Sequence, residues 1–228
     1  MFYLTRLSHS RQEEAAVCGV IPYLMDNIAA RTPSKTFALQ ILTDFAHTSD
    51  TTRDQLSRNE ALDFYLDLLV SQDTFWEEKA FISLGAWLSH ATPEVERAML
   101  RPRSLQRLVA LFQSAQSNHF ENYVKELLVM LTRSHKLSEA LGRSGLFMAE
   151  LVARLSFPKA EVRINLLKIL KIIADHQDDL EHLILDYNLF PVLNALCEDK
   201  SRVLVVEIAN QLLEEWQAAL GFGLDDPA

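Results

Sequence analysis

Glycine and proline are scarce in this sequence, with six and seven residues in 228. Folds built from sheets and tight turns use both residues heavily, so their scarcity beside abundant leucine and alanine favours an all-α protein. No segment alternates apolar and polar residues over a useful length, and no β-sheet is predicted. No apolar run approaches the roughly 18 residues of a membrane helix, and the N-terminus lacks a signal-peptide pattern. We therefore expect a cytoplasmic or nuclear protein without a membrane partner.

Cysteine is also rare, and positive charge is in the minority. Cys18 and Cys197 lie near opposite ends of the sequence, each among apolar residues, so both are expected to be buried and unpaired. The formal net charge is −9. Nucleic acids and anionic membranes attract basic surfaces, so neither is expected as the main partner. A solvated helix face is expected for the local cluster of arginines at Arg97, Arg101, Arg103 and Arg107.

Sequence patterns for catalysis are missing as well. There is no glycine-rich phosphate loop, no His-Arg-Asp catalytic loop and no Asp-Phe-Gly segment, and the glycine pair Gly142 and Gly145 is predicted to form a turn. The histidines are scattered, and His176 and His182 are six residues apart across a helix break, which is not a metal-ligand spacing. We predict no catalytic, cofactor-binding or metal-binding residue, and no cofactor.

The sequence consists instead of helical patterns separated by short polar breaks. Start and stop signals are Gly19 as a C-terminal cap, Ser104, Asp178 and Ser201 as N-caps, and Thr92 before a proline at a first helical position. The predicted helices span residues 2–7, 10–18, 20–30, 34–47, 53–58, 60–70, 74–89, 93–100, 104–115, 119–134, 136–142, 145–155, 159–176, 178–187, 189–198 and 201–219.

These helices recur with a period close to 42 residues. Leucines in the medium-length helices are 42 or 43 residues apart, and leucines in the long helices are 42 or 44 apart. The two series are Leu24, Leu66, Leu108, Leu151 and Leu193, and Leu42, Leu84, Leu128, Leu170 and Leu212. A short, a medium and a long helix in each period are typical of armadillo repeats. We therefore predict an armadillo- or HEAT-like α-solenoid of about five three-helix repeats.

A single solenoid domain is predicted over residues 1–220, followed by a flexible tail at 221–228. The first repeat is expected to be partial, because residues 1–18 look like the end of a repeat whose beginning is missing. The chain is therefore expected to be part of something longer. The predicted repeats cover approximately residues 1–33, 34–73, 74–118, 119–158 and 159–200, with a long capping helix at 201–220.

The predicted helix at 159–176 is apolar on more than one side. Opposite its buried stripe, Ile164 and Ile172 lie among Lys168 and Lys171. Packing between repeats explains much of this apolarity, and the alternative to it is a partner site on a concave wall formed by the long helices. An acidic motif or a helix would fit there. Transferring these positions to neighbouring repeats predicts the partner-binding residues Asn122, Glu126, Met130, Ile164, Lys168, Lys171, Ile172 and Asn210.

Several segments resemble, in order and spacing, a helical region of one protein-kinase family. They are residues 7–16 (LSHSRQEEAA), 19–24 (GVIPYL), 37–47 (FALQILTDFAH), 64–69 (FYLDLL), 117–122 (SNHFEN) and 159–170 (KAEVRINLLKIL). The family comprises the fungal septation-initiation and mitotic-exit network kinases, and the epsilon class of plant MAP kinase kinase kinases is similar. In these proteins the region follows the kinase domain. The resemblance covers about residues 5–175.

The resemblance implies a non-catalytic armadillo-like module of a cell-cycle kinase. It also implies a protein partner, a scaffold or a regulator with a phosphorylated or acidic motif, and localisation to the spindle pole body and the division site. Two alternatives stay open: the module pairs with itself as a homodimer, or the chain is a stand-alone adaptor without a kinase domain.

Overall fold

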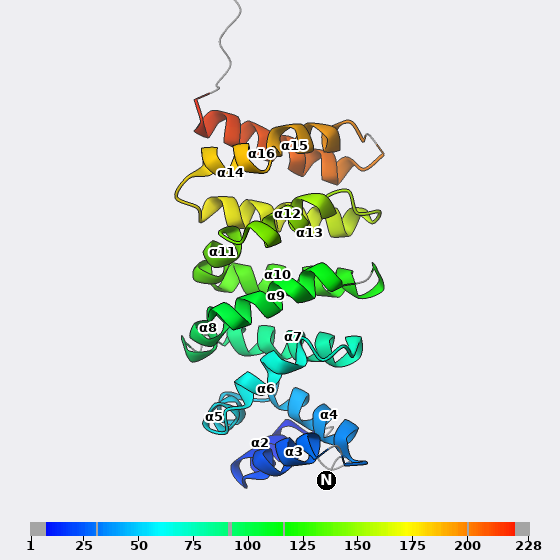
Figure 1. Cartoon of the computed structure of the whole chain (residues 1–228), viewed down its shortest axis with the longest axis vertical. Helices are drawn as coiled ribbons and strands as arrows, with labels where there is room; N and C mark the ends of the chain where they lie inside the picture. The colour runs from blue at the N-terminus through cyan, green and yellow to red at the C-terminus, as the bar shows by residue number, and fades with distance from the viewer. Residues whose placement is uncertain (1–7, 31, 91–92, 116, 200, 222–228) are drawn as a thin grey trace, which may run out of the picture. The chain divides into compact units, whose positions relative to one another are not determined.

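The computed structural model describes residues 8–30, 32–90, 93–115, 117–199 and 201–221. Within these ranges the chain forms fifteen helices, α2 to α16, and no strand, which confirms the prediction of an all-α fold (Figure 1). The chain divides into two compact units, Met1–Arg133 and Ser134–Ala228. The predicted helix at 2–7, the cap at Thr92 and the tail from residue 222 lie outside the described residues.

In the first unit, long helices pack against one another in chain order. Helix α4 contacts α7, and α7 contacts α10, while the medium-length helices α3 and α6 cover α4 and α7 (Figure 1). Its described helices are α2 (His9–Val17), α3 (Val20–Ala29), α4 (Lys35–Phe45), α5 (Asp50–Arg58), α6 (Ala61–Leu68), α7 (Thr74–Ser89), α8 (Pro93–Met99), α9 (Pro102–Ser114) and α10 (Ser117–Arg133).

The second unit follows the same order of short, medium and long helices. Helix α13 contacts α11, α12, α14 and α16, so it lies between the helices that precede it and those that follow it. Its described helices are α11 (His135–Gly142), α12 (Gly145–Arg154), α13 (Ala160–Asp175), α14 (Leu180–Asp186), α15 (Leu189–Cys197) and α16 (Val203–Ala219).

Short polar side chains start several of these helices. Ser49, Ser134 and Ser144 each accept a hydrogen bond from the backbone N–H three residues later, and Asp179 does the same for α14. Each side chain satisfies a donor that the first helical turn leaves without a helical partner. The cap of α14 is therefore Asp179, and the prediction of Asp178 was wrong by one residue.

Two other predicted N-caps are also wrong. Helix α9 begins at Pro102, whose fixed φ suits the first helical position, so Ser104 lies buried inside the helix. Helix α16 begins at Val203, and the hydroxyl of Ser201 donates instead to Oδ1 of Asp199 at 2.5 Å. The proline thus determines the start of α9, whereas the hydroxyl of Ser201 is bonded elsewhere and does not cap α16.

The end of α2 shows one confirmed and one wrong prediction. Gly19 has a φ of +80°, the left-handed geometry expected of a glycine just after a helix. Cys18 is exposed, because the buried face of α2 carries Ala15 and Ala16 and the cysteine lies off that face. Cys197 is half-buried, and burial raises the pKa of its thiol.

The core follows the leucine series of the sequence with one shift. The five leucines of the medium-length helices are buried, as are Leu42, Leu84, Leu170 and Leu212 in the long ones. In α10, however, Leu128 is only half-buried and Leu127 is buried at 4% exposure. Leu127 lies 43 residues from both Leu84 and Leu170, so the true spacing is more even than the predicted one.

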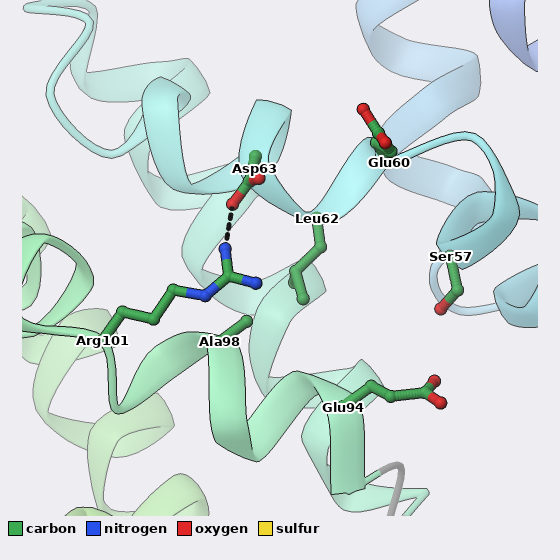
Figure 2. Close-up of a pocket in the computed structure, with 7 residues that line it drawn as sticks. All are labelled: Ser57, Glu60, Leu62, Asp63, Glu94, Ala98 and Arg101. Atoms are coloured by element: carbon green, nitrogen blue, oxygen red, sulfur yellow. Dashed lines mark hydrogen bonds and ion pairs between the residues drawn. The ribbon is translucent and has the colours of Figure 1, made fainter.

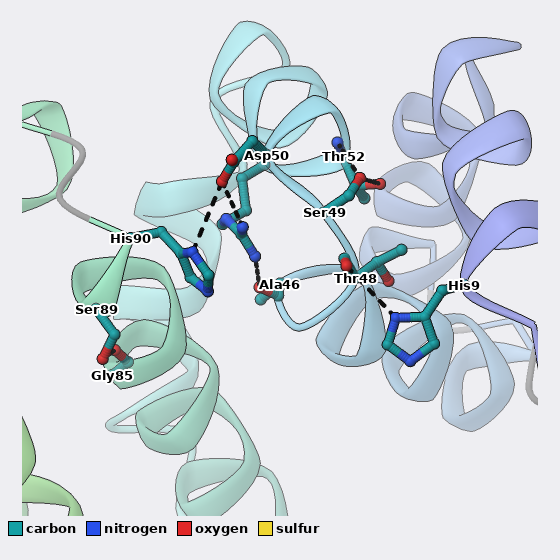
Figure 3. A network of polar contacts seen from close by, with 10 residues as sticks. His9, Ala46, Thr48, Ser49, Asp50, Thr52, Gly85, Ser89 and His90 are labelled. Atoms are coloured by element: carbon teal, nitrogen blue, oxygen red, sulfur yellow. Dashed lines mark hydrogen bonds and ion pairs between the residues drawn. The ribbon is translucent and has the colours of Figure 1, made fainter.

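A buried arginine, Arg53, joins the ends of helices in the first unit, close to Ala46, Asp50 and His90, which Figure 3 shows. Arg53 is 4% exposed, and its guanidinium donates to the backbone oxygen of Ala46 at 3.0 Å and to Oδ1 of Asp50 at 2.6 Å. The same carboxylate lies 3.7 Å from Nδ1 of His90. The hydrogen bond from Arg53 lowers the pKa of Asp50. Because Ala46 ends α4, a positive charge there also complements the helix dipole.

Gly142 allows close packing in the second unit. It is the last residue of α11, where the predicted helix 136–142 also ends, it lies directly before the turn that separates it from Gly145, and it is buried. A Cβ atom at this position would lie only 2.7 Å from Cγ2 of Ile173 on α13, which is closer than carbon atoms approach. The absent side chain therefore sets the distance between α11 and α13.

Gly142→Ala should lower the free energy of unfolding, because overpacking against Ile173 costs about 1–3 kcal/mol and exceeds the gain in helix propensity of about 1 kcal/mol. Urea denaturation followed by circular dichroism measures the change. Gly145→Ala is the matched control, since a Cβ there would meet only the hydroxyl of Tyr187 at 3.6 Å, an ordinary contact. Equal stability of the two variants would contradict the packing role of Gly142.

Candidate partner-binding surface

Five of the predicted binding residues lie on two neighbouring long helices of the second unit, α13 and α16. On α13, Lys168 is exposed, and the half-buried residues are Ile164, Lys171 and Ile172. On α16, Asn210 is exposed. We call this set the α13–α16 surface. It consists of Ile164, Lys168, Lys171, Ile172 and Asn210.

Lys171 is held by carboxylates instead of projecting freely. Its ammonium forms an ion pair with Glu215 of α16 and lies 3.7 Å from Oδ1 of Asp175. Gln211 also donates to Glu215, at 2.9 Å. The hydrogen bond with Glu215 is the main reason that the pKa of Lys171 is raised, and it lowers the pKa of Glu215 in return. The charge of Lys171 is thus compensated within the surface.

Lys168 differs from Lys171 in this respect. Its side chain is exposed, and it makes no ion pair with any of the residues that the structure describes. The half-buried side chains of Ile164 and Ile172 lie on the same helix. Lys168 is therefore the basic group that the α13–α16 surface presents to solvent.

In the first unit, Asn122 lies on α10 beside a carboxylate of α7. Its amide donates to Oε1 of Glu78 at 2.8 Å, and Nδ1 of His119 lies 2.9 Å from Oε2 of the same carboxylate. Asn122 remains exposed while making this bond. Glu78 thus links two side chains of α10 to α7.

The other two predicted residues of α10 face α7. Met130 is fully buried, and Glu126 is half-buried. A Cβ on Gly85 of α7 would lie 3.3 Å from Oε2 of Glu126 and 3.5 Å from Cγ of Met130, so both side chains occupy the space beside this glycine. Burial raises the pKa of Glu126. Met130 therefore packs inside the first unit, where a partner does not reach it.

The first unit also has a pocket of about 270 Å³ beside α5, α6 and α8, lined partly by Glu60, Asp63 and Glu94 (Figure 2). Arg101 lines the same pocket and donates to Oδ1 of Asp63 at 3.0 Å. Arg107 forms a similar pair with Asp67 of α6. Two of the clustered arginines thus join the α8–α9 segment to α6, and carboxylates outnumber guanidinium groups around the pocket.

One contact between two histidines was not predicted from the sequence. Nδ1 of His135 lies 2.5 Å from Nε2 of His176, and the hydroxyl of Ser138 lies 3.0 Å from the other ring nitrogen of His176. The two histidines are 41 residues apart, close to one period, and that spacing is the signal that could have found them. In the part of the chain that the structure describes, no group of three or more metal-ligating side chains is present.

This chain is similar in sequence to two groups of known proteins, plant MAP3K epsilon protein kinases and fungal cytokinesis proteins. No protein-family model matches it. The chain is 34% identical to MAP3K epsilon protein kinase 1 of Arabidopsis thaliana over 223 residues, 94% of this chain and 16% of that protein. It is 32% identical to cytokinesis protein sepH of Aspergillus terreus over 229 residues, 98% of this chain and 17% of that protein.

The chain therefore spans about a sixth of the length of the curated relatives that it matches. The resemblance drawn from the sequence segments is confirmed, and it extends beyond residue 175 to almost the whole chain. The described residues are entirely helical between their loops and contain no kinase domain. Among the described helices, none has the length and apolarity needed to cross a bilayer.

A solved structure supports the fold. An engineered protein known from a crystal structure aligns with a TM-score of 0.71 at 19% sequence identity, covering 92% of this chain and 85% of that one. At this level of identity the likeness concerns the fold alone.

Glu215→Gln should destabilise the second unit only slightly at neutral pH. Both side chains of the Lys171 pair are more than a third exposed, at 36% and 39%, and such pairs contribute about 0.2–1 kcal/mol. Because the folded state lowers the pKa of Glu215, its contribution is present above the unfolded pKa of glutamate, about 4.3, and is lost as the pH falls through the folded value. Urea denaturation at several pH values should show wild type and variant converging in acid.

The neighbouring Glu214→Gln is the matched control for this experiment. Glu214 is exposed and makes no ion pair with the described residues, so its replacement should leave stability unchanged at every pH. If the free energies of unfolding of wild type and Glu215→Gln differed as much in strong acid as at neutral pH, the side chain would act through packing and not through charge.

Proposed function

We propose that the chain is a non-catalytic protein-interaction module of a cell-division kinase. In this role it docks a scaffold or regulatory protein and thereby localises or controls the kinase. The observation that carries the proposal is the similarity of nearly the whole chain to about a sixth of proteins named as a MAP3K epsilon kinase and a cytokinesis protein. The absence of a phosphate-binding loop from the sequence and the helical fold of the described residues support a role in binding instead of catalysis.

The α13–α16 surface is the proposed docking site in the second unit. Lys168 supplies an exposed positive charge, and the neighbouring Ile164 and Ile172 supply partly exposed apolar area. This combination favours a partner segment that carries an acidic or phosphorylated side chain beside apolar ones. Asn210 on α16 adds an exposed amide group for hydrogen bonds with such a segment. We further propose that docking places the protein at the spindle pole body and the division site.

A fluorescent fusion of the chain, expressed in Aspergillus terreus, tests this proposal. The wild-type fusion should gather at division sites, and Lys168→Glu should reduce the labelled fraction at least fivefold by replacing attraction with repulsion, on the order of a 1 kcal/mol change. Lys35→Glu, which reverses an exposed lysine at the start of α4, is the matched control and should localise normally. A diffuse wild-type fusion, or undiminished localisation of Lys168→Glu, would contradict the proposal.

Sedimentation equilibrium separates docking of a partner from self-association. The purified chain should sediment as a monomer at micromolar concentration, because the docking surface is proposed to receive a different protein. A dimer that dissociates on dilution would favour the homodimer alternative, and Lys168→Glu would then be re-tested in the same measurement.

A further inference from the structure

A second pocket lies in the second unit, on residues that the α13–α16 surface does not use. Its volume is about 430 Å³, within the range of about 300–1,000 Å³ typical of ligand sites. Val152 of α12, Leu155 directly after that helix, and Val192 and Leu196 of α15 provide apolar walls. The guanidinium of Arg163, from α13, and the carboxylate of Asp199 also line it.

Two arginines share this one carboxylate. Nη1 of Arg163 lies 3.5 Å from Oδ2 of Asp199, and Nε of Arg202 lies 3.4 Å from the same oxygen. Both distances exceed the 2.7–2.9 Å or so of a strong charge-assisted hydrogen bond. Arg163 also donates to the backbone oxygens of Phe157 at 2.5 Å and Ser156 at 3.1 Å, which fix its position without neutralising it. Two guanidinium groups and one carboxylate therefore leave an excess of one positive charge at this cluster of Arg163, Arg202 and Asp199.

Arg202, the second partner of Asp199, has an unsatisfied donor. Its Nη1 is buried and has no hydrogen-bond partner among the described residues. Burial and, after it, the neighbouring Arg202 lower the pKa of Arg163. The two guanidinium groups approach the same carboxylate oxygen, so their like charges repel each other. A further anion would relieve this repulsion.

We propose that this pocket binds an acidic peptide motif of a partner protein, with a glutamate or aspartate carboxylate at Arg163 and adjacent aliphatic side chains between α12 and α15. A single carboxylate balances the surplus charge, whereas a phosphate of about −1.5 to −2 would leave the group negative beside Asp199. The inference rests on the proposed role as a docking module, but it assigns a different site from the α13–α16 surface.

Peptide titration of the full chain, followed by the amide resonances of Val192, Ala195 and Leu196, tests the site. The probe is acetyl-Leu-Glu-Leu-amide, and acetyl-Leu-Gln-Leu-amide and the phosphoserine analogue are the comparisons. The glutamate peptide should bind at least fivefold more tightly than either. The proposal is overturned if the glutamine peptide binds as tightly as the glutamate peptide, or if the phosphopeptide binds more tightly. It is also overturned if the amide resonances do not shift at millimolar peptide.

Asp199→Asn provides the sharper variant, because loss of the competing carboxylate raises the surplus charge and should tighten binding of the glutamate peptide at least threefold. Glu198→Gln removes one negative charge from the adjacent exposed residue and is the matched control. Thermal unfolding verifies that both variants fold. Weaker or unchanged binding by folded Asp199→Asn would overturn the site. If the glutamate peptide does not bind but the fluorescent fusion still gathers at division sites, the proposal for this pocket is wrong and the proposed docking function is unaffected.

Discussion

The structure depends on one packing constraint: each long helix has more apolar surface than a single neighbour covers. Helix α13 shows it most clearly, since Val162, Leu166, Ile169, Leu170 and Ile173 are all fully buried. Helices that precede and follow α13 in the sequence supply this cover. At about 25 cal/mol per Å² of apolar area removed from water, such contacts dominate the favourable energy of folding, and a long helix with one side uncovered would forfeit much of it.

The same constraint explains why so much of the fold follows from the sequence. Helix existence and order depend on local apolar patterns and on the scarcity of Gly and Pro, and α7 begins and ends where it was predicted, at Thr74 and Ser89. Ends that depend on competing neighbours were harder to predict. Helix α9 begins at Pro102 instead of Ser104, so its observed and predicted bounds differ by one or two residues at each end, and the packed face of the helix is the same.

The candidate site follows from the sequence less completely, because a helical pattern fixes a face but not the partner of each side chain. The period indicated that Lys171 and Met130 lie on the long helices. It did not predict that Glu215 compensates the lysine or that Met130 packs beside Gly85 of α7. The pairing of Arg163 and Arg202 at Asp199 depends on loop geometry after α15, which apolar periodicity does not describe.

The polar links between successive layers bear on how the chain folds. Asp63 to Arg101, His135 to His176 and Lys171 to Glu215 join residues 38, 41 and 44 positions apart. Each link therefore closes a loop of about one period, whose entropy cost grows only slowly with length. A chain stabilised by such short-range closures does not need its ends to meet before it gains energy, so folding can begin in either unit and spread to adjacent layers. Partly folded species with one unit intact are accordingly expected on the pathway.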